Sequence, residues 1–444
     1  MYLKRFLYLS YRRFYITSRW RKTRFSKAGG LVFILMGVSA VTSLDVSRNS
    51  GYSIFSILFT VYFFSIIFSK FLKIDLKIER ELPDYGTVDE ELNYYVKIKN
   101  NQDKKRESLF YMEIFSDPRP SFEDFITRVS PDEKKHNIWD QKTLYYRWDW
   151  LVKEGVSAKS EIKEFEIDKL ELKSLSISFT PLKRGILKLK GTIILQPDIF
   201  NIYRALKFYK EDNSIIILPK RYPINPIILK GDGKDRANDE SFSKTLGYGG
   251  DFFSLREYRK GDPLKSIHWK SWAKLGKPIV KEYQKRTFIR NALILDTFGE
   301  EGDIFEEAVS ITASFVSSIK NNESMLDIIF IQDKLFKMSK TKNESDDKIL
   351  KILATIKTDL DENFYKLELA IKDISSKTSS IILILLKLDS KRANLIDFLT
   401  LVGIKTKILL LTDREEKNIE KKYLENYPIS IIHTDTILDD LNSI

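Results

Sequence analysis

The chain of 444 residues is too long for one ordinary domain and indicates about two to four. Its 43% hydrophobic and 13% aromatic residues provide enough apolar surface for packed cores, which excludes a disordered or collagen-like chain. The sequence has no cysteine and three histidines. Disulfides, thiolate metal sites and a cysteine nucleophile are therefore excluded, and little remains for a histidine metal cage.

The net charge of +12 is concentrated at the N-terminus. Residues 1–44 hold nine Lys and Arg residues and no acid, so the other 400 residues carry 65 basic and 62 acidic side chains. A protein that binds nucleic acid more often spreads its positive charge over a folded face, so we expect no nucleic-acid partner. The basic arm, residues 1–27, either lies along an anionic membrane surface as an interfacial helix or serves only as a retention and orientation signal.

Two uncharged segments follow this arm. Residues 28–44 are a stretch of 17 without a charge, and residues 49–69 add 21 more. At about 1.5 Å per residue, helices of these lengths approach or reach the roughly 30 Å of a bilayer core. Because the link is short and basic residues flank both segments, the pattern predicts a transmembrane hairpin over 28–72 with both termini cytoplasmic. The alternatives are a cleaved signal peptide ending near Ala40 and a buried core hairpin.

The middle of the chain, residues 73–200, has apolar side chains at every second position, as at Leu92, Tyr94, Val96 and Ile98. This period over short runs predicts antiparallel strands and hence a β-sandwich-like domain. An inserted segment at 117–155 does not alternate and is rich in Trp and Tyr. It forms either a ligand or partner surface or, as is more common, a small core of its own. Residues 201–248 are expected to connect this domain to the next, with one strand at 215–218.

The segment 249–286 has a legible local pattern. Asp262 followed by Pro263 is typical of an N-cap and first helical turn, and Gly276 follows the last apolar residue of the helical face. We therefore expect a short helix over 263–275 with extended segments on both sides. Its basic side chains would form a cationic surface. His268 is either an acid or base or, in the interpretation we favour, a packed or solvated side chain.

This segment also carries a dense motif, made of Phe253, Leu255, Arg256, Glu257, Tyr258, Gly261, Asp262, Ile267, Trp269, Ala273, Lys274 and Lys277. On these residues it resembles the signature of the bacterial family called domain of unknown function 58. The order of a transmembrane pair, a β domain, the signature and an α/β domain resembles that family over about residues 30–415. One departure is Pro197–Asn201, which replaces the family's Asp-Pro-Phe-Gly turn and lacks its glycine.

The resemblance implies a partner more than a reaction. Relatives are commonly encoded beside a MoxR-type AAA+ ATPase, and sometimes beside transglutaminase-like or other von Willebrand factor A membrane proteins. The candidate residues for binding a partner or ligand are Arg256, Glu257, Tyr258, Arg259, Asp262, Lys265, Trp269, Lys270 and Lys274. The alternative is that Arg256, Glu257 and Asp262 form an ion-pair and capping network that only stabilises the junction between domains.

Residues 287–444 alternate between apolar strands and amphipathic helices, which predicts a parallel sheet covered on both faces. The resemblance implies a von Willebrand factor A-like domain here. Strands are expected at 292–296, 325–331, 380–387, 407–411 and 429–433, and helices at 303–320, 344–358, 361–374, 391–402 and 413–425. In open sheets the binding crevice lies at the carboxyl ends of the strands, where Asp296, Asp389 and Asp413 would lie.

Asp296 is the candidate metal ligand. A von Willebrand factor A metal site has the pattern Asp-x-Ser-x-Ser, whereas residues 296–300 are Asp-Thr-Phe-Gly-Glu, so both serine positions are lost. Glu300 would have to supply a replacement oxygen for Mg²⁺. An aspartate at a strand end is more often a turn former or a helix cap, so we expect no cofactor, with Mg²⁺ as the alternative.

The sequence therefore predicts an α+β multidomain protein with a two-helix transmembrane hairpin, an antiparallel β-sandwich-like domain and a C-terminal α/β, Rossmann-like domain. The leading hypothesis is a membrane-anchored interaction or scaffold protein that assists a MoxR-type ATPase in the assembly or maturation of other proteins. One alternative is a metal-dependent enzyme that uses Asp296 and Asp262, although no common catalytic motif is present. Another is binding of polyanions or lipid headgroups by the basic surface of the signature.

Overall fold

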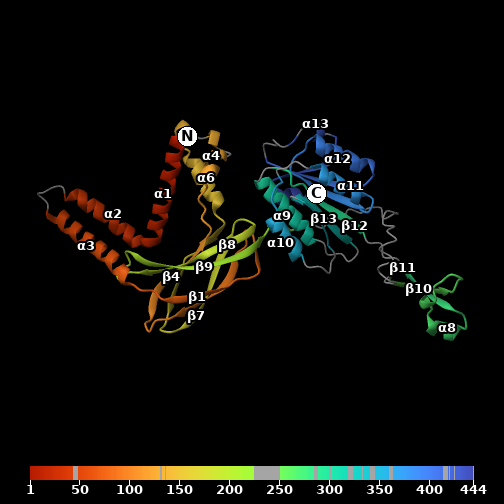
Figure 1. Cartoon of the computed structure of the whole chain (residues 1–444), viewed down its shortest axis with the longest axis horizontal. Coiled ribbons are helices and arrows are strands. Elements are labelled where there is room, and N and C mark those ends of the chain that lie inside the picture. The colour runs from red at the N-terminus through yellow and green to blue at the C-terminus, as the bar shows by residue number, and fades with distance from the viewer. Residues whose placement is uncertain are drawn as a thin grey trace. The chain divides into compact units, whose positions relative to one another are not determined.

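The computed structural model describes residues 1–43, 49–130, 133–135, 137–224, 251–284, 289–299, 302–318, 324–332, 334–340, 346–359, 364–413, 419, 421–424 and 426–443. The chain divides into two compact units, Met1–Leu218 and Pro219–Ile444. Both units combine helices with sheets (Figure 1), so the protein is a mixed α+β multidomain chain.

Three helices begin the first unit: α1 (Tyr2–Arg24), α2 (Lys27–Thr42) and α3 (Asn49–Phe71). Helices α2 and α3 pack against each other (Figure 1). Within the described residues, the stretch Gly51–Phe71 is the one helix long and apolar enough, by length and composition, to cross a membrane. Helix α2 is apolar but has 16 residues. The second span and the cytoplasmic position of both termini stay predictions.

The basic arm forms α1, which packs on the inserted segment. That segment folds into α4 (Phe122–Thr127), the 3₁₀ turn η1 (Glu133–Lys135), α5 (Ile138–Thr143) and α6 (Tyr145–Gly155). Tyr8 of α1 is buried between Phe125 and Trp148, and its hydroxyl donates a 3.2 Å hydrogen bond to the carbonyl of Pro120. The aromatic residues of the insertion thus form a small core, the more common of the two alternatives, and α1 completes it.

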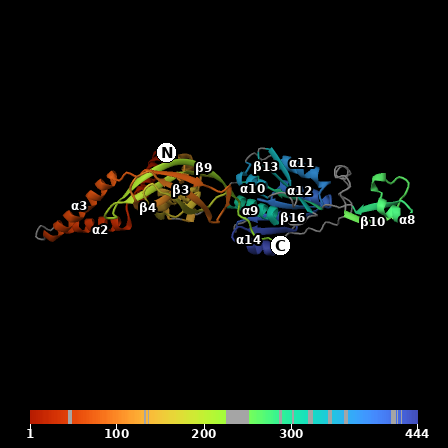
Figure 2. The same cartoon turned by 90° about the horizontal axis from the view of Figure 1, so that it is seen from below.

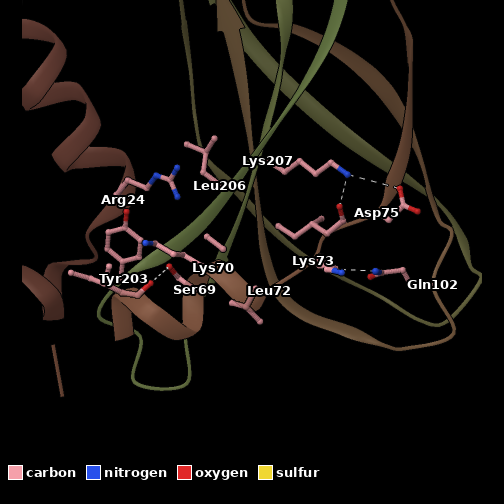
Figure 3. Close-up of a pocket in the computed structure, with 13 residues that line it drawn as sticks. Arg24, Ser69, Lys70, Leu72, Lys73, Asp75, Gln102, Tyr203, Leu206 and Lys207 are labelled. Carbon is pink, nitrogen blue, oxygen red and sulfur yellow. Dashed lines mark hydrogen bonds and ion pairs between the residues drawn. The ribbon is translucent and has the colours of Figure 1, made fainter. Parts of the chain in front are cut away.

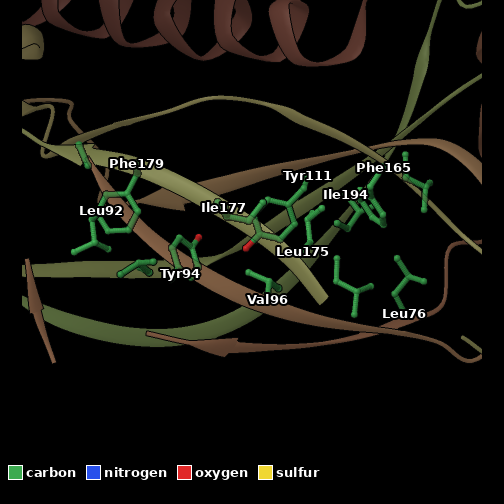
Figure 4. Packing of buried hydrophobic residues seen from close by; sticks show 14 of the residues in the cluster. Leu76, Leu92, Tyr94, Val96, Tyr111, Phe165, Leu175, Ile177, Phe179 and Ile194 are labelled. Atoms are coloured by element: carbon green, nitrogen blue, oxygen red, sulfur yellow. The ribbon is translucent and has the colours of Figure 1, made fainter. Parts of the chain in front are cut away.

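Two largely antiparallel sheets form the β domain. One has the order β1–β3–β7–β5, with β1 (Leu76–Glu81), β3 (Leu92–Asn100), β7 (Leu172–Pro181) and β5 (Ala158–Ser160). The other has the order β2–β9–β8–β4–β6, with β2 (Tyr85–Thr87), β9 (Arg204–Leu218), β8 (Gly185–Pro197), β4 (Arg106–Phe115) and β6 (Lys163–Ile167). All neighbours pair antiparallel except β2 and β9. Alternate residues of both sheets fill one core, as Tyr94, Tyr111 and Ile194 show in Figure 4.

The β domain extends beyond residue 200, where the sequence pattern predicted a connecting segment. Strand β9 pairs with β8 from Arg204 opposite Pro197 to Ile217 opposite Gly185. The alternation is hidden because residues 210–214 of this strand are all polar. The predicted strand at 215–218 is therefore only the end of a 15-residue strand.

The turn between β8 and β9 forms without the family's glycine. The buried carboxylate of Asp198 accepts hydrogen bonds from the backbone N–H of Ile202 at 2.8 Å and of Tyr203 at 3.0 Å. Asn201 has a φ of 52°, in the left-handed region that asparagine tolerates better than most residues. Asn201 therefore supplies the backbone conformation that a glycine would otherwise provide.

The signature folds into a small module, residues 251–284, which we call the signature module. Strands β10 (Asp251–Glu257) and β11 (Ile279–Gln284) pair antiparallel, as the extended flanks predicted. The single helix expected over 263–275 is wrong, since η2 (Leu264–Ser266) and α8 (Trp269–Leu275) are separate. Between them the backbone is extended, because Ile267 bridges to Val280 and the N–H of His268 donates to the carbonyl of Ile279 at 2.8 Å.

The C-terminal α/β part has one sheet in the order β14–β13–β12–β15–β16–β17. Figure 2 labels β13 and β16 of this sheet. Its strands are β12 (Ile289–Leu295), β13 (Ser324–Gln332), β14 (Lys334–Lys340), β15 (Ser380–Leu385), β16 (Lys405–Thr412) and β17 (Ile429–His433). All neighbouring pairs are parallel except β13 with β14. The five predicted strands are present, and the unpredicted β14 is a lysine-containing strand at the edge of the sheet.

The helices of this part are α9 (Asp303–Ser318), α10 (Asp347–Thr355), α11 (Phe364–Ser375), α12 (Ser390–Leu401), α13 (Lys421–Leu424) and α14 (Ile437–Asn442). Helices α11 and α12 bury Leu367 and Leu395 against one face of the central strands. Helix α9 contacts the same strands and buries ten of its residues. Strand β12 leads directly to Asp296 at its carboxyl end. Asp389 follows β15 after residues 386–388 and is the N-cap of α12, where its side chain accepts a hydrogen bond from the N–H of Arg392.

Candidate functional site

The signature module is built around an ion pair between Arg256 on β10 and Asp262 in the following loop. The two terminal nitrogens of Arg256 donate to the two carboxylate oxygens of Asp262 at 2.7 and 2.8 Å, and the N–H of Arg259 adds a bond of 2.8 Å. Such paired bonds are the strong form of an Arg–carboxylate contact. The hydrogen bonds from Arg256 and then from Arg259 lower the pKa of Asp262 to about 2.

This pair changes the roles expected from the sequence. Asp262 was predicted as a helix N-cap, but Pro263 is the N-cap of η2 and makes no side-chain bond there. The Asp262 carboxylate instead closes the loop by binding Arg256. Tyr258 also has a structural contact, because its N–H donates to the carbonyl of Pro278 at 2.9 Å. The ion pair of Arg256 with Asp262 that the alternative named is therefore present within the module, and its role at the junction between domains stays a prediction.

Other candidate residues of the module face solvent. Glu257 forms an exposed 3.4 Å ion pair with Lys277, of the kind that contributes little to stability. The side chains of Arg259, Lys265, Lys270 and Lys274 are all exposed. His268 is half-buried, and its Nδ1 lies 2.6 Å from the Ser271 hydroxyl.

The module also exposes apolar side chains. Trp269 is 65% exposed and stacks on Trp272 with 5.2 Å between ring centroids, and Leu264 and Leu275 are 69% and 64% exposed. Sequence analysis named Trp269 but missed the other three residues. Leu275 was assigned to the packed face of a continuous helix, and the break at Ile267 and His268 removes that face. The spacing of three residues between the tryptophans was the available signal for the stack.

The second candidate region lies at the carboxyl ends of the central strands of the α/β sheet, around Asp296. Arg392 of α12 donates from Nε to Oδ2 of Asp296 at 2.6 Å and from a terminal nitrogen to Asp389 at 2.7 Å. Its other terminal nitrogen donates to the carbonyl of Phe298 at 3.1 Å. Burial lowers the pKa of Arg392, but the carboxylates of Asp296 and then Asp389 outweigh it and raise that pKa overall. Two of the three predicted strand-end aspartates are thus joined through one guanidinium.

These residues do not fit the magnesium alternative. A divalent ion needs several oxygen ligands, yet Asp296 is fully buried with its Oδ2 on Arg392 and its Oδ1 accepting from the N–H of Phe298 at 3.0 Å. The hydroxyl of Thr297 donates to the carbonyl of Ile331. Across the described residues, no group of three or more His, Asp or Glu side chains is arranged to hold a metal ion. Glu300 lies outside the described residues.

Comparisons with known proteins leave the function open. No protein-family model matches the sequence. The uncharacterized protein YeaD of Bacillus subtilis strain 168 is 35% identical over 149 residues, which are 34% of this chain and 37% of that protein. Solved structures with similarity include the CARDB domain of PF1109 from Pyrococcus furiosus (14% identity, 32% of this chain and 93% of that one, TM-score 0.17). Another is the sporulation control protein Spo0M from Bacillus subtilis (11% identity, 42% and 59%, TM-score 0.16). TM-scores this low identify neither fold nor function.

Proposed function

We propose that this chain is a membrane-anchored interaction protein whose signature module docks a partner protein. The observation that carries the proposal is the exposed Trp269, which stacks on the half-buried Trp272 in a module that also exposes Leu264 and Leu275 and is closed by the Arg256–Asp262 pair. Tryptophan is among the residues most enriched at interface hot spots, and exposed apolar side chains supply the surface that an interface core buries. A rigid loop also lowers the entropy lost on binding.

The partner proposed from the motif is a MoxR-type AAA+ ATPase, with the chain as a member of the domain of unknown function 58 family. Support for a von Willebrand factor A-like domain is the sheet order around β12, with parallel strands to β17 and an antiparallel edge at β14. Other von Willebrand factor A or transglutaminase-like membrane proteins are the further partners proposed. The Arg392–Asp296 pair argues against a metal-dependent enzyme.

The proposed membrane arrangement has α2 and α3 as an antiparallel hairpin, with the remaining domains in the cytoplasm of a bacterial inner membrane. Its support is the apolar stretch Gly51–Phe71, the packing of α2 on α3 and the basic residues on both flanks. Because α1 packs on the insertion through Tyr8, the arm has a structural role beside any effect of its charge on orientation.

The docking proposal is tested with a Trp269→Ala variant in affinity capture from detergent-solubilised membranes, with ATP and with a non-hydrolysable analogue. We expect recovery of an identified AAA+ ATPase to fall about tenfold or more, since truncation of a hot-spot tryptophan costs about 2 kcal/mol or more. The matched control is Trp139→Ala, which removes a tryptophan that is 77% exposed on α5. Equal recovery with both variants would show that the stack is not the docking surface.

A second candidate function is polyanion binding by the exposed basic side chains of the module. Arg259, Lys270 and Lys274 are exposed in this module. Binding through them would weaken steeply with salt, with a slope set by the number of phosphates contacted. A triple Gln variant of these residues that leaves heparin binding and its salt slope unchanged would remove this alternative.

A further inference from the structure

A basic cavity lies where α3 ends against the β domain (Figure 3). Its volume is about 690 Å³, within the range of small-molecule sites. Its lining comes from the end of α3 between Ile66 and Lys70, the link 72–75, Tyr203 with the first residues of β9 up to Lys207, Gln102, and Arg24 at the end of α1. Segments up to 183 residues apart in the sequence therefore form one site.

Positive charge is in excess in this cavity. Arg24, Lys70, Lys73 and Lys207 line it, and the single acid among the lining residues is Asp75. Figure 3 shows Arg24 and Lys70 near Tyr203, with Lys73 and Lys207 farther along the wall. The Nζ of Lys207 donates to the carbonyl of Ile74 at 2.6 Å and lies 3.9 Å from Asp75.

The other three cations, Arg24, Lys70 and Lys73, have few negatively charged partners within the protein. Within the part of the chain that the structure describes, no carboxylate lies within ion-pair distance of Lys70, Lys73 or Arg24. One terminal nitrogen of Arg24 donates to the carbonyl of Arg204 at 3.3 Å, and its Nε is buried without a hydrogen-bond partner. A buried donor that lacks an acceptor costs free energy, which an anion in the cavity would recover.

The position of the cavity indicates where the anion comes from. Lys70 is in the last turn of α3, the helix whose stretch Gly51–Phe71 is long and apolar enough to cross a membrane. In that same turn Phe68 and Phe71 are 46% and 74% exposed, and offer apolar surface to acyl chains. The end of a spanning helix lies at the level of the lipid headgroups, where basic pockets bind anionic headgroups.

The geometry points to a site for the phosphate of an anionic phospholipid, with Arg24, Lys70, Lys73 and Lys207 as its cations. This inference rests on the proposed membrane anchoring by α3. A phosphodiester carries one negative charge and two free oxygens, which accept hydrogen bonds from Arg and Lys. The competing explanation is that Lys70 and Lys73 only orient the helix in the membrane. Lys207 separates the two, because it belongs to β9 and does not flank a membrane segment in the sequence.

The test is native mass spectrometry of the full-length protein released from nanodiscs that contain equal amounts of phosphatidylglycerol and phosphatidylcholine. We expect phosphatidylglycerol to be retained preferentially, and Lys207→Gln and Lys70→Gln/Lys73→Gln to reduce its retention about fivefold and about tenfold or more. The control is Lys159→Gln/Lys188→Gln, which removes two exposed strand lysines that do not line the cavity. Equal reduction in all three variants, or none in any, would overturn the site.

Two further measurements identify the source of the phosphate and check that the variants fold. Glycerol 1-phosphate is titrated against the lipid-bound protein, and displacement at micromolar concentration would overturn the lipid source in favour of a soluble phosphate. Retained thermal midpoints show that the variants fold.

Carbonate washing of membranes tests the membrane anchor separately. Wild-type protein that stays in the membrane but shows no headgroup preference overturns the site alone, whereas protein that is washed off overturns both the anchor and the site.

Discussion

The Nε of Arg392 donates a 2.6 Å hydrogen bond to Oδ2 of Asp296, across 96 residues of sequence, and both side chains are almost fully buried. The guanidinium of Arg392 also pairs with Asp389, so Arg392 supplies the positive charge at the carboxyl ends of these strands. The carboxyl ends of the strands are where an open α/β sheet ordinarily binds its ligand. The ion pair therefore leads to two predictions, one for the stability of the α/β part and one for metal binding at Asp296.

Removing one partner of this buried pair should be strongly destabilising. We expect Arg392→Met to lower the free energy of unfolding by about 3–5 kcal/mol, because Asp296 is left as a buried, uncompensated charge. The measurement is urea unfolding of the detergent-solubilised protein, with Lys391→Met, an exposed neighbour, as the control. The double variant Asp296→Leu/Arg392→Met should recover part of the loss. A double variant as unstable as the sum of its single variants would argue that the pair itself is not responsible.

The same pair predicts the response to metal. We expect Mg²⁺ and Mn²⁺ to leave the thermal midpoint of the native protein unchanged at millimolar concentration, since Asp296 already binds Arg392. Isothermal titration provides the direct measurement. Sub-millimolar Mg²⁺ binding that disappears in Asp296→Ala would reverse this conclusion and restore the metal-dependent alternative.

The pH response of the signature module follows from Asp262. Its pKa of about 2 in the folded protein lies below the ordinary value of 3.8. The stabilisation from the Arg256–Asp262 pair is therefore fully present above about pH 4 and is lost as the pH falls through about 2. Carboxyl-carbon NMR measures this titration. We expect Arg256→Ala to raise the pKa of Asp262 toward 3.8 and Lys277→Ala, which removes the partner of Glu257, to leave it unchanged. A native pKa near 4 would contradict the bidentate geometry.

The attachment of α2 to the β domain depends on Gly29. A Cβ placed on Gly29 would lie 2.2 Å from the carbonyl oxygen of Ile202, whereas one on Gly30 would meet nothing within 4 Å. We expect Gly29→Ala to lower stability by about 1–3 kcal/mol through overpacking. Gly30→Ala should leave it unchanged or raise it by up to about 1 kcal/mol, because alanine favours helix. Thermal unfolding in detergent compares the two, and equal midpoints would show that α2 does not dock on the turn at Ile202.

A buried polar network joins the two sheets of the β domain. Glu113 is ion-paired with Arg80 at 2.6 Å and accepts hydrogen bonds from the hydroxyls of Tyr94 at 2.5 Å and Tyr111 at 2.7 Å. Burial, followed by the charges of Tyr111 and Glu113, raises the pKa of Tyr94, which keeps its hydroxyl a neutral donor.

Loss of the Tyr94 hydroxyl should therefore be costly. We expect Tyr94→Phe to lower the free energy of unfolding by about 1.5–3 kcal/mol, the range for hydrogen bonds to charged groups. Tyr95→Phe is the matched control, because the adjacent Tyr95 is 58% exposed on the other face of β3. Denaturant unfolding gives both values. A loss for Tyr94→Phe no larger than that for Tyr95→Phe would show that this hydroxyl contributes little.

Local patterns in the sequence determined much of the fold. Alternation at Leu92–Ile98 predicted β3, and the continuous apolar run 381–386 within the predicted strand 380–387 predicted β15, since each depends only on which faces of a strand are buried. The uncharged segment 49–69 predicted a long apolar helix equally clearly, and the structure has the stretch Gly51–Phe71 there. The signature residues could be named from the sequence, but the surface they form could not. Whether Trp269 is exposed depends on the break at His268, which a backbone bond to Ile279 on another strand imposes.

Only the tertiary structure decided which segments distant in the sequence pair with each other. Tyr8 packs on Trp148, Arg392 binds Asp296, and β9 completes a sheet despite its polar middle. The basic cavity likewise combines Arg24 with Lys70 and Lys207. Periodicity indicates how each segment divides its residues between core and solvent. The residues that neighbour a charged or aromatic side chain in the sequence do not identify its distant partner. Partners are chosen when the sheets and helices pack, and that choice turned a candidate metal ligand into one half of a buried ion pair.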